Sequence, residues 1–322
     1  MSTLYAAFAF LFGLAFGSFL NVCIYRIPLA LPEEAPGESW LRSLARGVAA
    51  WRAVQTPSRS FCPNCHHSIR WFDNLPVLSW LLLRGRCRDC RARIRFRYTA
   101  VELLTAVLFL VSYLRSGPTL ETGKFCVFAF LVIGLIFADA EHRLLPDAFT
   151  APGALLGIIF SALVPLTGLA HYLPLFVSKP LPPPLPSLLD SLLGALIGAA
   201  FIFGSGLAYR LARGHEGMGL GDVKMMAMIG AFLGLKLALL TIFLASLFGS
   251  LFGAFLFLSV WVKRWRRLLR RRQASRAAAR RAWISAQLVR YYAIPFGVFL
   301  GIAALFSSFL GDAAFQWYWA RF

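Results

Sequence analysis

The sequence predicts an all-α polytopic membrane protein of about eight transmembrane helices, with a small cytoplasmic domain between the first two. Three observations lead to this fold class. First, 59% of the 322 residues are hydrophobic and only 15% are charged, whereas a soluble globular domain carries about 25% charged residues. Second, long apolar runs recur along the chain. Third, the basic residues concentrate in two stretches that lie between such runs.

The apolar runs define the expected helices, because a helix that crosses a bilayer needs about 20 apolar residues. Eight segments meet or approach this length: 4–23, 100–114, 125–138, 149–166, 188–211, 223–235, 237–262 and 293–310. The first lacks the charged start and the small-residue cleavage site of a signal peptide, so we expect it to be retained. Residues 167–186 contain six prolines, which indicates an extended external loop.

The formal net charge of +19 would suit a nucleic-acid-binding protein, but its distribution indicates a membrane topology. Thirteen of the 33 lysines and arginines lie at 26–97 and eleven at 263–290. Because cytoplasmic loops are enriched in Lys and Arg, both stretches are placed in the cytoplasm. Eight helices then put both termini outside and 28 of the 33 basic residues inside. We therefore expect no nucleic acid as a partner, and we expect the acid-free run 263–281 to contact the anionic inner leaflet.

These features divide the chain into three expected parts. Residues 1–25 form the first transmembrane helix, and residues 26–99 form the cytoplasmic domain. Residues 100–322 form a seven-helix membrane bundle with a basic cytoplasmic loop at 263–290. Two cysteines in apolar runs, Cys23 and Cys126, are expected to be small core residues.

The other four cysteines form two C-x2-C pairs in the cytoplasmic domain: Cys62, Cys65, Cys87 and Cys90. Each pair matches a zinc knuckle, and four thiolates complete a tetrahedral zinc site. Two disulfides are the alternative, but the cytoplasm keeps thiols reduced. His66 and His67 are close enough in sequence to compete as ligands. Four sulfur ligands leave no open position, so the predicted Zn²⁺ is structural rather than catalytic.

Asp139 and Asp222 stand where a carboxylate is costly, at the cytoplasmic ends of predicted spans. Asp222 ends the motif Gly219-Leu-Gly221-Asp222, whose glycines allow close helix contact and unwound backbone beside the carboxylate. Two carboxyls that share one proton can perform aspartic proteolysis, in which one activates water and the other polarises the scissile carbonyl. Two other interpretations stay open: helix-end acids paired with basic neighbours such as Lys224, or the ion site of a transporter.

The motifs follow one another in an order that resembles the bacterial type IV prepilin leader peptidases, which are membrane aspartic proteases of the GxGD kind and include N-methyltransferases. The resemblance covers nearly the whole chain. It is carried by Gly17–Val22 with Arg26-Ile27-Pro28, the two cysteine pairs, Asn74-Leu75-Pro76, Arg97-Tyr98 with Glu102, Asp139–Asp147, Glu216–Lys224 and Ile294–Gly297. Thr99-Ala100, Val298 and the long basic insertion at 263–290 depart from the pattern.

The resemblance implies that Asp139 and Asp222 are the catalytic residues. It assigns supporting roles to five further residues: Gly219, Gly221, Lys224, Glu216 and Asp147. The implied reaction removes the leader peptide from type IV prepilins or type II secretion pseudopilins at the cytoplasmic face of the bacterial inner membrane. Relatives with the cytoplasmic domain also methylate the new N-terminus with S-adenosylmethionine. No Rossmann-type glycine motif occurs here, so the residues that bind this cofactor stay unassigned. The alternatives are another GxGD intramembrane protease, or a transporter or assembly scaffold.

Overall fold

The computed structural model describes residues 2–30, 59–166, 182–214, 217–270 and 295–321, with a few residues between 47 and 55 and Gly168. Within these ranges the chain is helical, no strand is formed, and only two isolated β-bridges occur, Phe61 with Ser68 and Arg86 with Arg93. The all-α prediction is therefore confirmed for the described residues. Glu216 and the part of the basic loop beyond residue 270 lie outside them.

Six of the described helices are long and apolar enough to cross a membrane. These are α1 (Ser2–Ala30), α4 (Arg97–Ser116), α5 (Leu120–His142), α7 (Leu185–Arg213), α8 (Leu220–Arg270) and α10 (Phe296–Trp319). Helix α6 (Asp147–Leu163) is apolar but shorter. The segment between α1 and α4 contains the short helices η1 (Trp71–Asn74) and α3 (Leu78–Leu82). The structure thus supports a multi-pass membrane protein.

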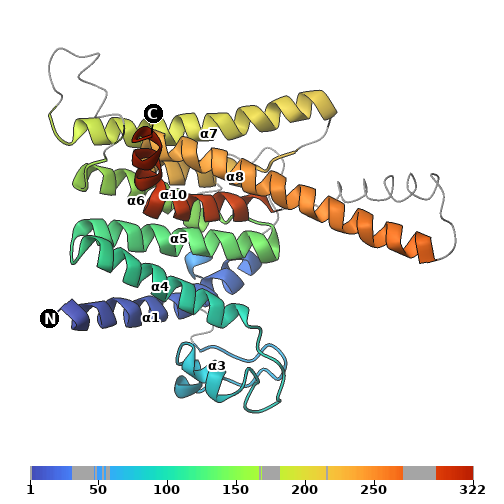
Figure 1. Cartoon of the computed structure of the whole chain (residues 1–322). Coiled ribbons are helices and arrows are strands. Elements are labelled where there is room, and N and C mark those ends of the chain that lie inside the picture. The colour runs from blue at the N-terminus through green and yellow to red at the C-terminus, as the bar shows by residue number, and fades with distance from the viewer. Residues whose placement is uncertain are drawn as a thin grey trace.

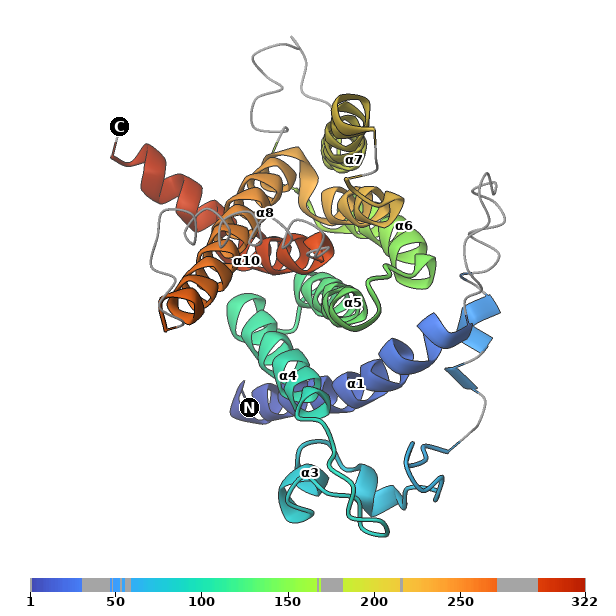
Figure 2. The same cartoon turned by 90° about the vertical axis from the view of Figure 1, so that its right-hand side faces the viewer.

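Helix α5 lies at the centre of the bundle, with α1 and α4 on one side and α6, α8 and α10 on the other (Figures 1 and 2). Its sequence is apolar around the whole helix, which is typical of a helix surrounded by other helices. Twelve of its 23 residues are buried. The last turn of this central helix carries Asp139, so the fold places that carboxyl inside the bundle.

Helix α8 breaks at Gly234, where φ is 76° and ψ is 176°. Only glycine adopts this conformation readily. Asp190 of α7 lies against the break and accepts a hydrogen bond from the Leu235 amide at 3.2 Å. Close backbone contact holds α7 here, because a Cβ on Gly230 would lie 2.2 Å from the Gly194 carbonyl oxygen. The first half of α8, which carries Asp222, is therefore a separate segment fixed against α7.

Candidate functional site

Asp139 and Asp222 lie at the same end of the bundle, although 83 positions separate their numbers. Asp139 is in the last turn of α5 and is 6% exposed; Asp222 is in the first turn of α8 and is 9% exposed. The two carboxyls are close enough for the charge of Asp139 to act on Asp222. Leu145 links the neighbourhoods of the two aspartates. It packs against Gly221, which directly precedes Asp222, and it lies next to Gly297, which Asp139 also approaches. The structure thus brings the two predicted aspartates into one site.

Helix α10 forms the third wall of this site through two glycines spaced four residues apart. A Cβ on Gly297 would lie 2.8 Å from Asp139 Oδ2. A Cβ on Gly301 would lie 2.4 Å from Ile136 Cγ1 and 3.2 Å from Met225 Cε. Ile136 and Met225 are each three residues from an aspartate, so α5 and α8 meet on the same small-residue face of α10, as small residues permit in membrane helices.

The start of α10 also binds Asp139 directly. The backbone amide of Val298 donates a hydrogen bond to Asp139 Oδ2 at 3.1 Å. Pro295 precedes the helix in an extended conformation, so the first amides of α10 have no partner within the helix. A carboxylate placed there satisfies such an amide and interacts favourably with the helix dipole. No sequence motif predicts this role of the helix start, because the contact joins residues 159 positions apart.

The chain returns to the site directly after Asp139. Arg143 ends α5 in the left-handed conformation, and its amide bonds to the Asp139 carbonyl at 2.9 Å. Helix α6 begins at Asp147 after Pro146. Lys224, one turn along α8 near Asp222, contacts both carboxylate oxygens of Asp147 at 2.8 Å. This ion pair fixes the start of α6 to the start of α8.

The residues predicted to support the catalytic pair differ in their surroundings. Gly221 packs against Leu145, since a Cβ there would lie 3.0 Å from Leu145 Cβ. Gly219 has open space above it, with nothing nearer than 3.9 Å. Lys224 and Asp147 pair with each other as described above, and Glu216 lies outside the described residues. The glycine motif therefore leaves one open face immediately before Asp222.

The cysteine-containing segment between α1 and α4 is joined to this end of the bundle by Glu141, which follows Asp139 by two residues. Glu141 Oε1 forms an ion pair with Arg97 Nε at 2.9 Å, and Arg95 Nη1 lies 3.9 Å from the same oxygen. Both arginines follow the second cysteine pair in the sequence. The sequence analysis recognised the motif that contains Glu141 but assigned it no partner.

The four predicted cysteine ligands meet in a single cluster, with all Sγ atoms within 4.8 Å of one another. Cys62 Sγ and Cys90 Sγ are 3.8 Å apart. A Zn–S bond of about 2.3 Å in a tetrahedral site places sulfurs about 3.8 Å apart, so the cluster fits zinc. Among the described residues, no histidine belongs to this cluster.

The two cysteine pairs form equivalent turns. The amides of His66 and Arg91 bond to the carbonyls of Cys62 and Cys87 at 2.8 and 3.1 Å, and both residues have positive φ. His66 therefore occupies the same place in its turn as Arg91 does, which explains why its side chain is not among the ligands. Cys23 is buried in the core as expected, and Cys126 is partly buried.

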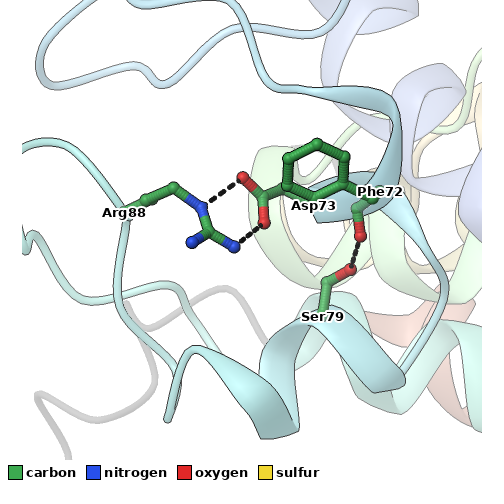
Figure 3. Close-up of polar contacts among 4 residues, drawn as sticks. All are labelled: Phe72, Asp73, Ser79 and Arg88. Carbon is green, nitrogen blue, oxygen red and sulfur yellow. Dashed lines mark hydrogen bonds and ion pairs between the residues drawn. The ribbon is translucent and has the colours of Figure 1, made fainter.

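An ion pair ties the second cysteine turn to η1 (Figure 3). Arg88 donates from Nε and Nη2 to the two carboxylate oxygens of Asp73 at 2.8 and 2.6 Å, while the Ser79 hydroxyl donates to the Phe72 carbonyl at 2.9 Å. The hydrogen bonds from Arg88 lower the pKa of Asp73 below its ordinary value of 3.8. The pair thus holds η1 and α3 against the metal cluster.

A cavity of about 450 Å³ opens beside this ion pair, in the same segment between α1 and α4. It combines guanidinium, aromatic, hydroxyl and amide groups, and it is lined by Arg59, Ser60, Ser68, Ile69, Arg70, Trp71, Phe72 and Asn74. Arg70 and Arg88 both lie over the Phe72 ring, at 5.9 and 5.5 Å from its centroid. The volume lies within the range of about 300–1,000 Å³ that is usual for small-molecule sites.

A helical bundle with two buried carboxyls at one end, joined to a cluster of four cysteines that could hold a metal, defines a polytopic membrane protein with a pair of buried acids. Comparisons with known families specify this further. Residues 11–116 match the bacterial peptidase A24 N-terminal domain, and residues 126–254 match the type IV leader peptidase family. The chain belongs to the type IV leader peptidase family.

Several similar curated proteins carry the name prepilin leader peptidase/N-methyltransferase. The protein of Aeromonas hydrophila is 36% identical over 235 residues, which cover 72% of this chain and 74% of that protein. Those of Dichelobacter nodosus and Neisseria gonorrhoeae are 35% and 34% identical, covering 70% and 69% of this chain and 74% and 72% of the relatives. No solved structure matches the chain.

Proposed function

We propose that this protein is a membrane aspartic endopeptidase that removes the leader peptide of type IV prepilins or type II secretion pseudopilins and then methylates the new N-terminus. The observation that carries the proposal is the meeting of Asp139 and Asp222 in one buried site, in a chain of the leader peptidase family. Relatives that share more than two thirds of their length with this chain carry both activities in their name.

The contacts around each aspartate suggest how the hydrolysis divides between them. Asp139 accepts the Val298 amide at the start of α10, where the helix dipole favours a negative charge. Asp139 is therefore the ionised member and takes a proton from the attacking water, while the protonated Asp222 transfers its proton to the scissile carbonyl oxygen as the tetrahedral intermediate forms. When the tetrahedral intermediate breaks, Asp139 passes its proton to the leaving amine and the carbonyl proton returns to Asp222. The open face above Gly219 gives an extended substrate strand access to this pair.

Mass spectrometry of a purified leader-bearing pilin, incubated with the full-length protein in detergent or liposomes, tests the proposal. We expect the leader to be removed by the wild-type protein and not by Asp139→Asn or Asp222→Asn. Asp312→Asn, which removes a carboxylate paired with Lys236 at 2.8 Å, is the matched control and should cleave normally. A wild-type protein that inserts, keeps its metal and leaves every leader-bearing pilin intact would overturn the proposal.

The four cysteines are proposed to hold a structural Zn²⁺. Their sulfur donors and their spacing fit that ion, and four protein ligands leave no place for a catalytic water. When bound, the metal fixes the fold of the cytoplasmic domain. Metal analysis of the purified full-length protein tests this assignment, and a folded protein without metal contradicts it.

The cavity beside Asp73 and Arg88 is proposed as the site for S-adenosylmethionine, which supplies the transferred methyl group. Its donor set fits the cofactor. The guanidinium of Arg59 or Arg70 can bind the amino-acid carboxylate, while Phe72 offers an aromatic face for the adenine ring or the sulfonium cation. Calorimetric binding of the cofactor to full-length Arg70→Ala, compared with wild type, tests this. Equal affinity in a variant that retains its metal contradicts the placement.

The finer topology is proposed from the helices. If α6 and both halves of α8 on either side of Gly234 cross the membrane, the six long helices and α6 give eight spans. The aspartates then lie on the cytoplasmic side of the inner membrane, beside the basic residues 26–97, and the basic stretch from residue 263 contacts anionic lipid. Accessibility labelling of single cysteines introduced in the connecting loops tests each crossing.

A further inference from the structure

Helix α3 carries an apolar face that none of the residues described in the structure covers. Leu78 and Leu81 are each 57% exposed and Leu82 is 79% exposed. They occupy positions i, i+3 and i+4, which form one face of a helix. Trp71 in the preceding η1 is 80% exposed. Large apolar side chains that cluster on a surface mark an interaction site.

The opposite face of α3 explains why these leucines point outward. Ser79 is buried and its hydroxyl binds the Phe72 carbonyl at 2.9 Å. The indole of Trp80 donates to the Ile94 carbonyl at 3.3 Å and packs on Phe96. These contacts fix the rotation of the helix, so the leucines cannot turn into the domain.

The position of α3 shows what lies against this face. Figure 1 shows α3 beside α1 and α4 rather than beyond their ends, and Figure 2 shows it outside the group of packed helices. The amide of Val77, which directly precedes α3, bonds to Glu102 Oε2 at 2.8 Å. Glu102 is five residues into the membrane-spanning helix α4. This contact anchors the start of α3 alongside the end of a transmembrane helix, at the level of the membrane surface.

The charges near α3 match one leaflet of the membrane. Seven arginines and one aspartate lie between residues 84 and 97, directly after the apolar face. Three of the arginines pair with Asp73 or Glu141 as described above, and the other four are exposed: Arg84, Arg86, Arg91 and Arg93. Anionic lipids attract basic residues at the surface, and Trp and Leu enter the boundary between headgroups and acyl chains. A helix of five residues is too short to cross the bilayer, so its contact with lipid is limited to this boundary.

We propose that the α3 face, Leu78, Leu81, Leu82 and Trp71, inserts into the lipid leaflet on the side of the bundle where Asp139 and Asp222 lie. The neighbouring arginines bind the anionic headgroups of that leaflet. The cytoplasmic domain is thereby held flat against the membrane surface, next to the catalytic end of the bundle.

Photo-crosslinking in liposomes tests this proposal with the full-length protein. Leu81→p-benzoylphenylalanine is compared with Asp89→p-benzoylphenylalanine, an exposed position of the same domain. The zinc content of each variant verifies that its domain folds. Leu103 of α4, 43% exposed on a transmembrane helix, is the positive control. We expect lipid adducts at position 81 in amounts similar to position 103, and at least about tenfold above position 89.

Two further measurements complete the test: the dependence of the adduct yield on lipid composition, and the formation of adducts with an added pilin substrate. The adduct yield at position 81 should rise when phosphatidylglycerol replaces part of the phosphatidylcholine, and it should lose this dependence when Arg84 and Arg86 are replaced by Gln. Yields at position 81 as low as those at position 89 would overturn the proposal. Adducts to an added pilin substrate in place of lipid would overturn it as well, because they would show that the face binds protein.

Discussion

Replacing Gly297 by alanine perturbs Asp139, the proposed general base, without a substitution at either aspartate. The added Cβ would lie 2.8 Å from Asp139 Oδ2 and 3.1 Å from Leu145 Cδ1, so the carboxylate must move away from the start of α10. That movement breaks the 3.1 Å hydrogen bond from the Val298 amide. A hydrogen bond to a charged group contributes about 1.5–3 kcal/mol. If this stabilisation acts in the transition state, kcat falls by about 10- to 150-fold.

The assay is steady-state leader cleavage by the full-length variant, with KM and kcat measured separately. KM should change little, because the substrate strand does not contact Gly297 in the proposed arrangement. Gly204→Ala is the matched control, since a Cβ there meets nothing within 4 Å, and it should leave both constants unchanged. A Gly297→Ala protein with normal thermal stability and a wild-type kcat would refute the role assigned to the start of α10.

Three further predictions concern contacts around the site and the metal. Cys90→Ser should lose zinc and increase protease sensitivity of the cytoplasmic domain, while leader cleavage continues because both aspartates lie in the bundle; metal analysis and limited proteolysis measure this, and retained zinc contradicts it. Lys224→Met and Asp147→Asn should each weaken cleavage by about fivefold or less, as expected for a partly exposed ion pair of about 1 kcal/mol, and the double variant should cost no more than one single variant; additive losses would show that the pair does not act as a unit. Asp73→Asn should lower the protection factors of the η1 amides in hydrogen exchange, and the ratio of wild-type to variant protection factors should be the same at pH 7 and pH 5. Arg88 lowers the pKa of Asp73, so the contribution of the carboxylate to stability is complete above pH 3.8 and is lost only as pH falls through the lowered pKa.

The sequence was sufficient for the features that depend on composition and local spacing. Apolar runs of membrane-spanning length predicted the helical class, and two C-x2-C pairs predicted the cluster of Cys62, Cys65, Cys87 and Cys90. The count of eight spans stays a prediction, because α8 is continuous apart from its break at Gly234. Hydropathy alone does not distinguish a broken helix from two spans.

Other features depend on contacts between distant segments, which leave no periodic pattern in the sequence. The amide of Val298 and the carboxylate of Asp139 meet only because α5 and α10 pack on small residues. The expected end of the first helix at residue 25 also differs from the structure, in which α1 continues to Ala30. Hydropathy falls at Arg26, but its guanidinium bonds to the carbonyls of Val54 and Arg59 at 2.7 and 3.3 Å. The helix therefore continues as a polar turn that contacts the cytoplasmic domain.

The most direct measurement for the carboxylate pair is single-turnover leader cleavage by Asp139→Asn, Asp222→Asn and the double variant in one membrane preparation. Groups that act as a unit in catalysis show strongly non-additive losses. The account predicts that each single variant falls to the same background rate as the double variant. A single variant that retains a tenth or more of the wild-type rate, with the second substitution reducing it independently, would contradict a shared hydrolytic water between Asp139 and Asp222.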